Sequence, residues 1–250
     1  MTLAERMKGY ERTTRDYLLH RTPVIIRVDG RAFHTFTRHL KKPFDEFFMK
    51  AMLMSAGKLA ESMQGFKVAY IQSDEASFLI TDYDRIESQG WFDYNINKMV
   101  SISASTMSIW FNKFFVDARD TKNPPIFDSI SIWFNKLFVD AGNPKNPPIF
   151  DSRAFNVPDE DIANYFLWRS LDWKRNSLLA YTQSFFSHKQ MQGKKQEDMH
   201  EMLHSIEKNW TTDLKDVEKN GTFLVNDPIL GIIIRQNILP TYEEISQLFQ

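Results

Sequence analysis

The sequence predicts an α+β fold in which an antiparallel sheet carries helices on one face and continues into a helical C-terminal extension. From residue 24 onward, short β-branched runs and longer segments of helical periodicity follow the order β-α-β-β-α-β. That order is typical of a sheet whose helices pack on one side. No stretch rich in Gly and Ser divides the chain, so we expect residues 1–250 to form a single domain.

Each predicted element has its own local evidence. The strands are runs rich in β-branched and aromatic residues bounded by turn residues, and the helices repeat apolar residues at helical spacing. Pro43 suits the first turn of the second helix, and Ser73-Asp74-Glu75 between two short strands is a hairpin pattern. The elements, in order, are helix 1–20, strand 24–28, helix 43–63, strands 67–72 and 76–81, helix 92–115, strand 149–158, helices 159–186 and 194–210, and a hairpin within 221–240.

Composition narrows the class of protein. Hydrophobic residues make up 42% of the chain and charged residues 25%, with a formal net charge of −1, which is the balance of a globular domain. Because the net charge is near zero, nucleic-acid binding would require a local basic face. The absence of cysteine excludes disulfides and cysteine-based zinc sites or nucleophiles. The N-terminus is too charged for a signal peptide and the apolar runs are too short for a membrane span, so we expect a cytoplasmic protein with no membrane partner.

A tandem duplication of 23 residues lies between the predicted helix 92–115 and the predicted strand 149–158. Its two copies are residues 108–130 and 131–153. Between Ser108–Ser129 and Ser131–Ser152 only four aligned positions differ. Two copies are too few for a solenoid, which needs about three or more. The first copy continues the preceding helix and the second leads into the next strand, so roughly Arg119–Ala141 is surplus. Its apolar residues are expected to pack on the domain surface or at a subunit contact; they are Ile126, Phe127, Ile132, Trp133, Phe134, Leu137 and Phe138.

Two carboxylates fall where predicted strands end. Asp29 follows the run 24–28 and Asp74 lies in the hairpin turn, so both side chains reach one end of the sheet if these strands are neighbours. Adjacent carboxylates repel unless a proton or cation neutralises them, and Mg²⁺ prefers such oxygen ligands together with substrate phosphates. Two such ions about 3.5–4 Å apart can assist phosphoryl transfer, and the Gly30 carbonyl is a further candidate ligand. For either segment alone, an ordinary turn is the alternative.

A second motif suggests a different metal. The stretch His200-Glu201-Met202-Leu203-His204 matches H-E-x-x-H, which places two imidazoles on one helix face as zinc metalloproteases require. No histidine follows His204, so a third ligand would have to be Glu218, Glu243 or Glu244. The flanking residues are typical of a solvated helix, and a zinc protease is therefore the less favoured alternative.

Basic and aromatic residues recur near the C-terminal helices. Trp173-Lys174-Arg175-Asn176 and the stretch His188–Lys195 are candidates for contact with RNA phosphates. A solvated helix face is the alternative explanation, and composition favours it.

Three motifs carry a resemblance to a known family. RVDGRAFHTFT at 27–37, QSDEASF at 72–78, and FDSRAFNVP followed by NYFLWRSLDWKRNS resemble the tRNA-histidine guanylyltransferase family, most closely its Thg1-like branch. The resemblance runs from about residue 18 to residue 210. It implies a fold similar to the polymerase palm, and an enzyme that adds nucleotides to the 5′ end of tRNA in the 3′-to-5′ direction.

The resemblance also implies roles for individual residues. Asp29, Asp74 and the Gly30 carbonyl would hold two Mg²⁺ ions. The catalytic residues would be Asp29, Asp74, Glu75 and Lys42, with Glu75 beside the ions and Lys42 helping to activate the RNA 5′ end together with Ser73. The residues expected to contact the nucleoside triphosphate are Asp29, Gly30, Arg31, Ala32, Phe33, His34, Ser73, Asp74 and Asn176.

The implied reaction has two steps. ATP or GTP activates a 5′-monophosphate RNA, unless the RNA already carries a triphosphate, and the 3′-hydroxyl of an incoming nucleotide then attacks the activated phosphate. Positioning and metal electrostatics would supply most of the acceleration. The implied partners are tRNA and nucleoside triphosphates, and the implied assembly is a homotetramer.

Two departures from the family pattern leave alternatives open. Lys174-Arg175-Asn176-Ser177 stands where the eukaryotic enzymes carry His-Ile-Asn-Asn, which favours repair of truncated tRNA 5′ ends over strict G addition to histidine tRNA. The duplication lies between a palm helix and the next palm strand, so a non-catalytic RNA-binding protein is one alternative. Another palm-type nucleotidyl transferase or cyclase, which would share the metals but not the RNA, is a second.

Overall fold

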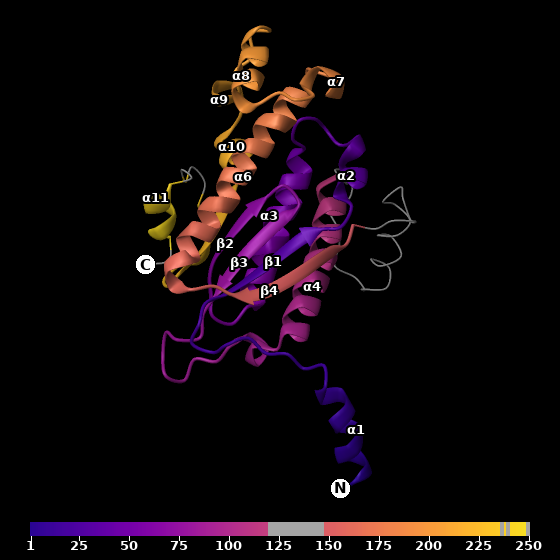
Figure 1. Ribbon diagram of the computed structural model, residues 1–250, viewed down its shortest axis with the longest axis vertical. Helices are drawn as coiled ribbons and strands as arrows, with labels where there is room; N and C mark the ends of the chain where they lie inside the picture. Colours follow the sequence, from indigo (N-terminus) through magenta and orange to yellow (C-terminus); the bar gives the residue numbers. More distant parts are fainter. Residues whose placement is uncertain (120–147, 236–237, 239–240, 249–250) are drawn as a thin grey trace.

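A single six-stranded sheet forms the centre of the molecule (Figure 1). The computed structural model describes residues 1–119, 148–235, 238 and 241–248. The strand order is β4-β1-β3-β2-β5-β6, and all neighbouring strands are antiparallel, which confirms the predicted α+β fold. The strands are β1 (Val24–Gly30), β2 (Phe66–Gln72), β3 (Glu75–Ile80), β4 (Phe150–Asn156), β5 (Thr222–Asp227) and β6 (Gly231–Arg235).

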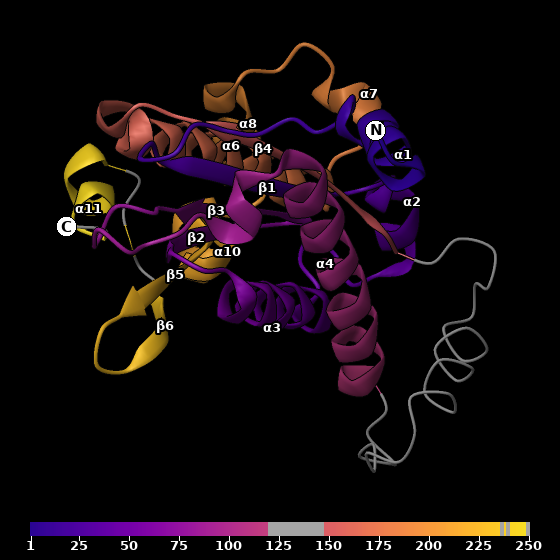
Figure 2. The ribbon, with the colours of Figure 1, turned by 90° about the horizontal axis from the view of Figure 1, so that it is seen from below.

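Helices cover both faces of this sheet, as Figure 2 shows. The two helices of the β-α-β-β-α-β unit, α3 (Glu46–Ser62) and α4 (Ile96–Arg119), share one face as predicted. The long helix of the C-terminal extension, α6 (Ile162–Gln183), covers the other face. The remaining helices are α1 (Leu3–Arg12), α2 (Phe33–Phe36), α7 (His188–Met191), α8 (Gln196–His204), α9 (Trp210–Asp213), α10 (Asp216–Asn220) and α11 (Tyr242–Ser246), with 3₁₀ turns η1 (Thr37–His39), η2 (Trp91–Tyr94) and η3 (Asp159–Asp161).

Alternation along β1 divides the core into two layers. Ile26 and Val28 are fully buried in the cluster that includes Phe111 of α4, whereas Ile25 is fully buried in the cluster that includes Phe166 of α6. Successive side chains of a strand point to opposite faces, so a continuous apolar run is required where both faces are covered. Each such aliphatic side chain contributes about 1.5–3 kcal/mol by its burial.

Four predicted helices are shorter than expected. The helix expected at 43–63 begins at Glu46 with Asp45 as its N-cap, so Pro43 lies before its first turn, and the helix expected at 159–186 spans Ile162–Gln183. The helix expected at 1–20 ends at Arg12, and none of its residues is buried. The helix expected at 194–210 ends at His204, after which Glu207 adopts a left-handed backbone with φ 57. A non-glycine residue in that region interrupts helical geometry, and nothing in the local apolar pattern indicates it.

The duplicated segment joins α4 to β4. The first copy begins within α4, which continues to Arg119, and the second copy ends within β4. Asn112 donates from Nδ2 to the Pro148 carbonyl at 2.8 Å, and the Phe150 amide donates to Ser108 Oγ at 3.0 Å. These contacts link the start of one copy to the end of the other. The apolar residues expected to pack on the surface, within 126–138, lie outside the described residues.

Among the helices described in these ranges, none has the length and apolar character needed to cross a membrane.

Candidate active site

Asp29 and Asp74 lie at the same end of the sheet. β1 and β3 are neighbours, and the register places Asp29 opposite Glu75. The Gly30 amide donates to the Asp74 carbonyl at 3.0 Å, which ties the end of β1 to the β2–β3 turn. The condition set by the sequence, that these two strands be adjacent, is therefore met.

Burial and charge act together on Asp74. Its pKa is raised to about 6, first because the carboxyl is largely removed from water and then because the negative charge of Asp29 is near. Hydrogen bonds from the local backbone and from the Ser73 hydroxyl oppose this rise in the pKa. A pair of carboxylates that disfavour each other's ionisation is stabilised when a cation lies between them.

The donor set at this end of the sheet fits Mg²⁺. Asp29 and Asp74 offer carboxylate oxygens and Gly30 offers a carbonyl, which are the hard oxygen ligands that this ion prefers. In the described part of the chain, no group of three or more His, Asp or Glu side chains could hold a metal on its own. Mg²⁺ usually takes one or two carboxylates and completes its shell with water and substrate phosphates, so a small protein donor set is compatible with it.

The loop after β1 combines exposed and buried residues. A Cβ on Gly30 would lie 2.4 Å from Cδ2 of Phe33, so the Phe33 ring packs in the space that glycine leaves. The Phe33 side chain is buried in the core, whereas Arg31, Ala32 and His34 are exposed. Of the residues expected to surround a nucleotide, Phe33 can therefore contribute only its backbone.

A cavity of about 580 Å³ brings together three of the predicted site residues, Lys42, Ser73 and Asn176. They come from the loop before α3, the β2–β3 turn and α6, respectively. Lys42 Nζ donates to the Thr37 carbonyl at 3.0 Å. The wall also carries Lys41, Lys50 and Lys215 beside Asp45, Glu46 and Glu218. The volume lies in the range of about 300–1,000 Å³ that is usual for small-molecule sites.

Two buried polar atoms of residues that line this cavity have no hydrogen-bond partner among the described residues. They are Oε1 of Gln72, which is 5% exposed, and Nε1 of Trp173, which is 7% exposed. Buried polar groups nearly always have partners, so these two atoms are candidates for contact with a bound ligand or an ordered water. Sequence reasoning missed Gln72 as a site residue and considered Trp173 only for RNA contact.

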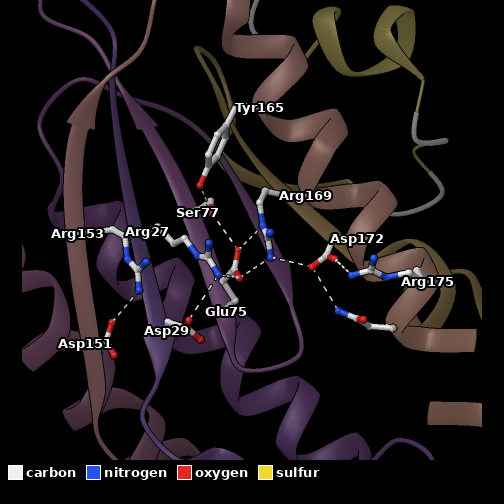
Figure 3. A network of polar contacts seen from close by, with 11 residues as sticks. Arg27, Asp29, Glu75, Ser77, Asp151, Arg153, Tyr165, Arg169, Asp172 and Arg175 are labelled. Carbon is white, nitrogen blue, oxygen red and sulfur yellow. Dashed lines mark hydrogen bonds and ion pairs between the residues drawn. The ribbon is translucent and has the colours of Figure 1, made fainter. Parts of the chain in front are cut away.

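Glu75 is engaged by two arginines (Figure 3). Arg169 of α6 donates from Nε to Oε1 at 2.8 Å and from Nη2 to Oε2 at 2.7 Å. Arg27 of β1 also bonds Oε2 and lies 3.5 Å from Asp29. Glu75 directly follows Asp74 and pairs in register with Asp29, and both its carboxylate oxygens are paired with arginine. Sequence reasoning missed both arginines, although Arg27 is conspicuous as a charge within an apolar strand.

The H-E-x-x-H motif has no zinc-site geometry in the described residues. His200 and His204 both lie on α8, but no third acidic or histidine ligand joins them there. The His200 ring instead contacts Trp210 at a centroid distance of 6.1 Å, and burial lowers its pKa, with a further contribution from His204. The motif is therefore explained as part of a surface helix packed on a core aromatic.

An antiparallel sheet with two carboxylates at one end, beside a ligand-sized cavity with lysines on its wall, is typical of palm-type nucleotidyltransferases. The model of the family Thg1, tRNAHis guanylyltransferase, matches residues 4–158, and the chain belongs to this family. The resemblance carried by the sequence motifs is thereby confirmed.

Solved structures and relatives agree with this assignment. A bacterial tRNA(His) guanylyltransferase (Thg1)-like protein in complex with ATP is 32% identical, with a TM-score of 0.82 over 100% of this chain and 99% of that chain. Such a bacterial protein in complex with GTP is 29% identical, with a TM-score of 0.75 over 99% of each chain. A probable tRNA(His) guanylyltransferase of Dictyostelium discoideum is 30% identical over 183 residues, which is 70% of this chain and 59% of that protein. This chain therefore spans less than two thirds of that relative's length.

Proposed function

We propose that this protein adds nucleotides to the 5′ end of tRNA, with ATP or GTP as nucleotide substrates and two Mg²⁺ ions at the reacting centre. The observation that carries the proposal is the meeting of Asp29 and Asp74 at one end of the sheet, beside the cavity that holds Ser73, Lys42 and Asn176. The similarity of this chain to bacterial proteins solved with ATP and with GTP supports the choice of substrates.

The proposed roles follow from the chemistry of each group. Asp29, Asp74 and the Gly30 carbonyl would hold Mg²⁺, which when bound neutralises phosphate charge and favours ionisation of an attacking hydroxyl. Lys42 places a positive charge on the cavity wall, where it orients a phosphate group. Asn176, which also lines the cavity, offers an amide to orient the RNA 5′ end or the nucleotide.

The cavity supplies the positioning. Gln72 and Trp173 offer one acceptor and one donor, which suit the hydrogen-bonding edge of a base or a sugar. Holding two phosphate-bearing groups in reactive orientation removes much of the entropic barrier to their reaction. Ser73, which lines the cavity and directly precedes Asp74, would donate a hydrogen bond to a phosphate oxygen.

We also propose that repair of truncated 5′ ends, rather than recognition of one tRNA, is the main activity. Lys174 and Arg175 are exposed on α6 beside Asn176, and positive side chains bind RNA phosphates without reading bases. A panel of truncated tRNAs, of which histidine tRNA is one, tests this directly. Comparable extension of several tRNAs is expected, and extension of histidine tRNA alone would contradict it.

A cytoplasmic homotetramer is the proposed assembly. None of the residues of α1 is buried, and its large apolar side chains Leu3, Met7 and Tyr10 are exposed. An isolated helix of this length is only marginally stable in water, so packing on a second copy of the chain would account for it. Sedimentation equilibrium of the chain with and without residues 1–12 measures this, and an unchanged stoichiometry would exclude α1 from the interface.

The experiment uses a tRNA that lacks its first nucleotide and is labelled at the 5′ end, incubated with the protein, Mg²⁺ and all four nucleoside triphosphates. The wild type is expected to extend it, and Asp29→Ala/Asp74→Ala is expected not to. Glu61→Ala/Glu87→Ala removes two exposed carboxylates elsewhere and serves as the control, which should extend normally. Absence of extension by the wild type would overturn the proposed function, and extension by the Asp29/Asp74 variant would overturn the role of these two residues.

A further inference from the structure

A continuous path of polar contacts joins the two aspartates' end of the sheet to the cavity wall (Figure 3). It crosses from β1 to β3 and then to α6, which lies far from both strands in the sequence. The path runs through Asp29, Arg27, Glu75, Arg169, Asp172 and Asn176.

The central link of this path is a buried, bidentate ion pair. Arg169 is 5% exposed and Glu75 is 6% exposed, and the two fork bonds between them measure 2.8 and 2.7 Å. A paired fork fixes orientation as well as distance, because the guanidinium and the carboxylate must be coplanar. Glu75 directly follows Asp74 and is the register partner of Asp29, so its position is tied to both. The side chain of Arg169 therefore places α6 relative to the proposed metal ligands.

The outer link extends to the cavity. Asp172 accepts from Arg169 Nη2 at 3.3 Å, and through the same oxygen it accepts from Asn176 Nδ2 at 3.3 Å. Its other oxygen accepts from Arg175 at 2.6 Å. Because Asp172 lies one turn before Asn176 on α6, this contact directs the Asn176 amide. Phe166 and Trp173 of α6 also pack in the core on this side of the sheet, so apolar contacts and the polar path hold the same helix.

We propose that Arg169 is a positioning residue that couples Asn176 to the Asp29–Asp74 pair during nucleotide transfer. The inference rests on the proposed function and deepens it. Arg169 neither lines the cavity nor contacts the two aspartates. It would act by fixing the position of Asn176, which lines the cavity, relative to Glu75, which adjoins the aspartates. A displacement of about 1 Å between reacting groups can cost roughly 100-fold in rate, so loss of this link should act on kcat.

The test compares Arg169→Lys with the wild type in extension of the truncated tRNA, together with thermal unfolding of each. Lysine keeps the charge opposite Glu75 but cannot form the fork. We expect kcat per folded molecule to fall by about 10- to 100-fold, while KM for the nucleotide and for tRNA change less than about 3-fold. Arg153→Lys is the control, because Arg153 is 54% exposed and pairs only with Asp151 within the network; its kcat should not change.

A double-mutant cycle with Asn176→Ala separates positioning from general stability. If Arg169 acts through Asn176, the double variant should be no slower than the slower single variant. If Arg169→Lys does not fold, Asp172→Asn replaces it, since Asp172 is 22% exposed on its side chain and the Glu75–Arg169 pair stays intact. It should show the same fall in kcat and the same lack of additivity.

The outcomes distinguish this inference from the function on which it rests. An unchanged kcat in Arg169→Lys, or effects of Arg169 and Asn176 that multiply, would overturn the positioning role while the wild type still extends tRNA. A wild type that extends no tRNA would overturn the proposed function and the inference together.

Discussion

Asn112 donates a hydrogen bond from its side-chain amide to the carbonyl of Pro148 at 2.8 Å, although 36 positions separate the two residues. Asn112 belongs to the first copy of the tandem duplication and Pro148 to the second. The equivalent of Pro148 in the first copy is Pro125, 13 positions after Asn112, so one copy contains both partners of this contact. The contact closes the connection between α4 and β4 across a surplus length of chain.

Deletion of residues 119–141 should therefore leave a folded and active protein. The partners Ser108, Asn112, Pro148 and Phe150 all remain, and the connection shortens by 23 positions. A shorter loop loses less entropy on closure, so the free energy of unfolding should rise by up to roughly 1 kcal/mol. Denaturant unfolding measures the change in the free energy of unfolding. Asn112→Ala, made in the full-length chain and in the deletion variant, tests whether the contact with Pro148 is kept in both. A deletion variant that unfolds at much lower denaturant would show that the surplus segment is structurally required.

Stability of the metal-free protein should depend on the ionisation of Asp74. Its pKa is about 6 in the folded state against an ordinary value of 3.8, so between these pH values the folded state binds the proton more tightly than the unfolded state. This contribution to stability is present at low pH and is lost as the pH rises from about 4 through 6. Mg²⁺ at the carboxylate reverses the loss, so it should raise the melting temperature more at pH 7 than at pH 5.

The measurement for Asp74 is thermal unfolding with EDTA or Mg²⁺ at the two pH values. Asp74→Asn is the matched variant. Its side chain cannot ionise, so the effect of Mg²⁺ on its melting temperature should not differ between pH 5 and pH 7 on account of this site. An equal effect of Mg²⁺ on the wild type at both pH values would contradict the link between Asp74 and the ion.

Gly30→Ala should disrupt the loop after β1. Its Cβ would lie 2.4 Å from the buried Phe33 ring, which packs against Phe48 and Phe111 and cannot move without disturbing both. Overpacking of this kind costs about 1–3 kcal/mol. Gly57→Ala is the control, since nothing lies within 4 Å of its Cβ position in α3, and it should stabilise the helix by up to about 1 kcal/mol. Similar unfolding curves for the two variants would contradict the packing argument.

Trp173→Phe should lower nucleotide affinity more than it lowers stability. It removes an indole N–H that has no partner among the described residues, but it also leaves space in the core, so the ligand-free protein should lose about 1 kcal/mol of stability. If that N–H serves the nucleotide in the cavity, the Kd of ATP or GTP should rise by about 5- to 10-fold, equivalent to a hydrogen bond of roughly 1 kcal/mol. Calorimetric titration measures the Kd. An unchanged Kd would mean that the N–H does not contact the nucleotide.

The fold was predictable because its information is local. Each of the six strands is visible as an apolar or alternating run, and the β2–β3 hairpin follows from residues 73–75 alone. Helix ends were less predictable, since the end of α8 depends on the turn that contains Glu207. The placement of α6 on the second face was not predicted as such, because Ile25 and Val28 look alike in a sequence and only the fold assigns them to different layers.

The site was predictable only in part, for a similar reason. Asp29 and Asp74 mark visible strand ends, but their meeting depended on the adjacency of β1 and β3, which only the fold supplies. Lys42 and Asn176 were reached through the family resemblance, and both line the cavity. The Glu75–Arg169 pair joins residues 94 positions apart across a helix and a strand. The apolar periodicity of α6 indicates which side of the helix faces the sheet, but no local pattern indicates that Arg169 on that side meets Glu75.

Asp29 and Asp74 are proposed to hold the Mg²⁺ used in nucleotide transfer to tRNA. The most direct measurement is the rate of extension of the 5′-labelled truncated tRNA as a function of Mg²⁺ concentration, for the wild type and for Asp29→Asn. We predict no extension in EDTA, a saturable dependence for the wild type, and for the variant a lower maximal rate that requires more Mg²⁺. Extension in EDTA, or the same Mg²⁺ dependence in both proteins, would contradict the claim.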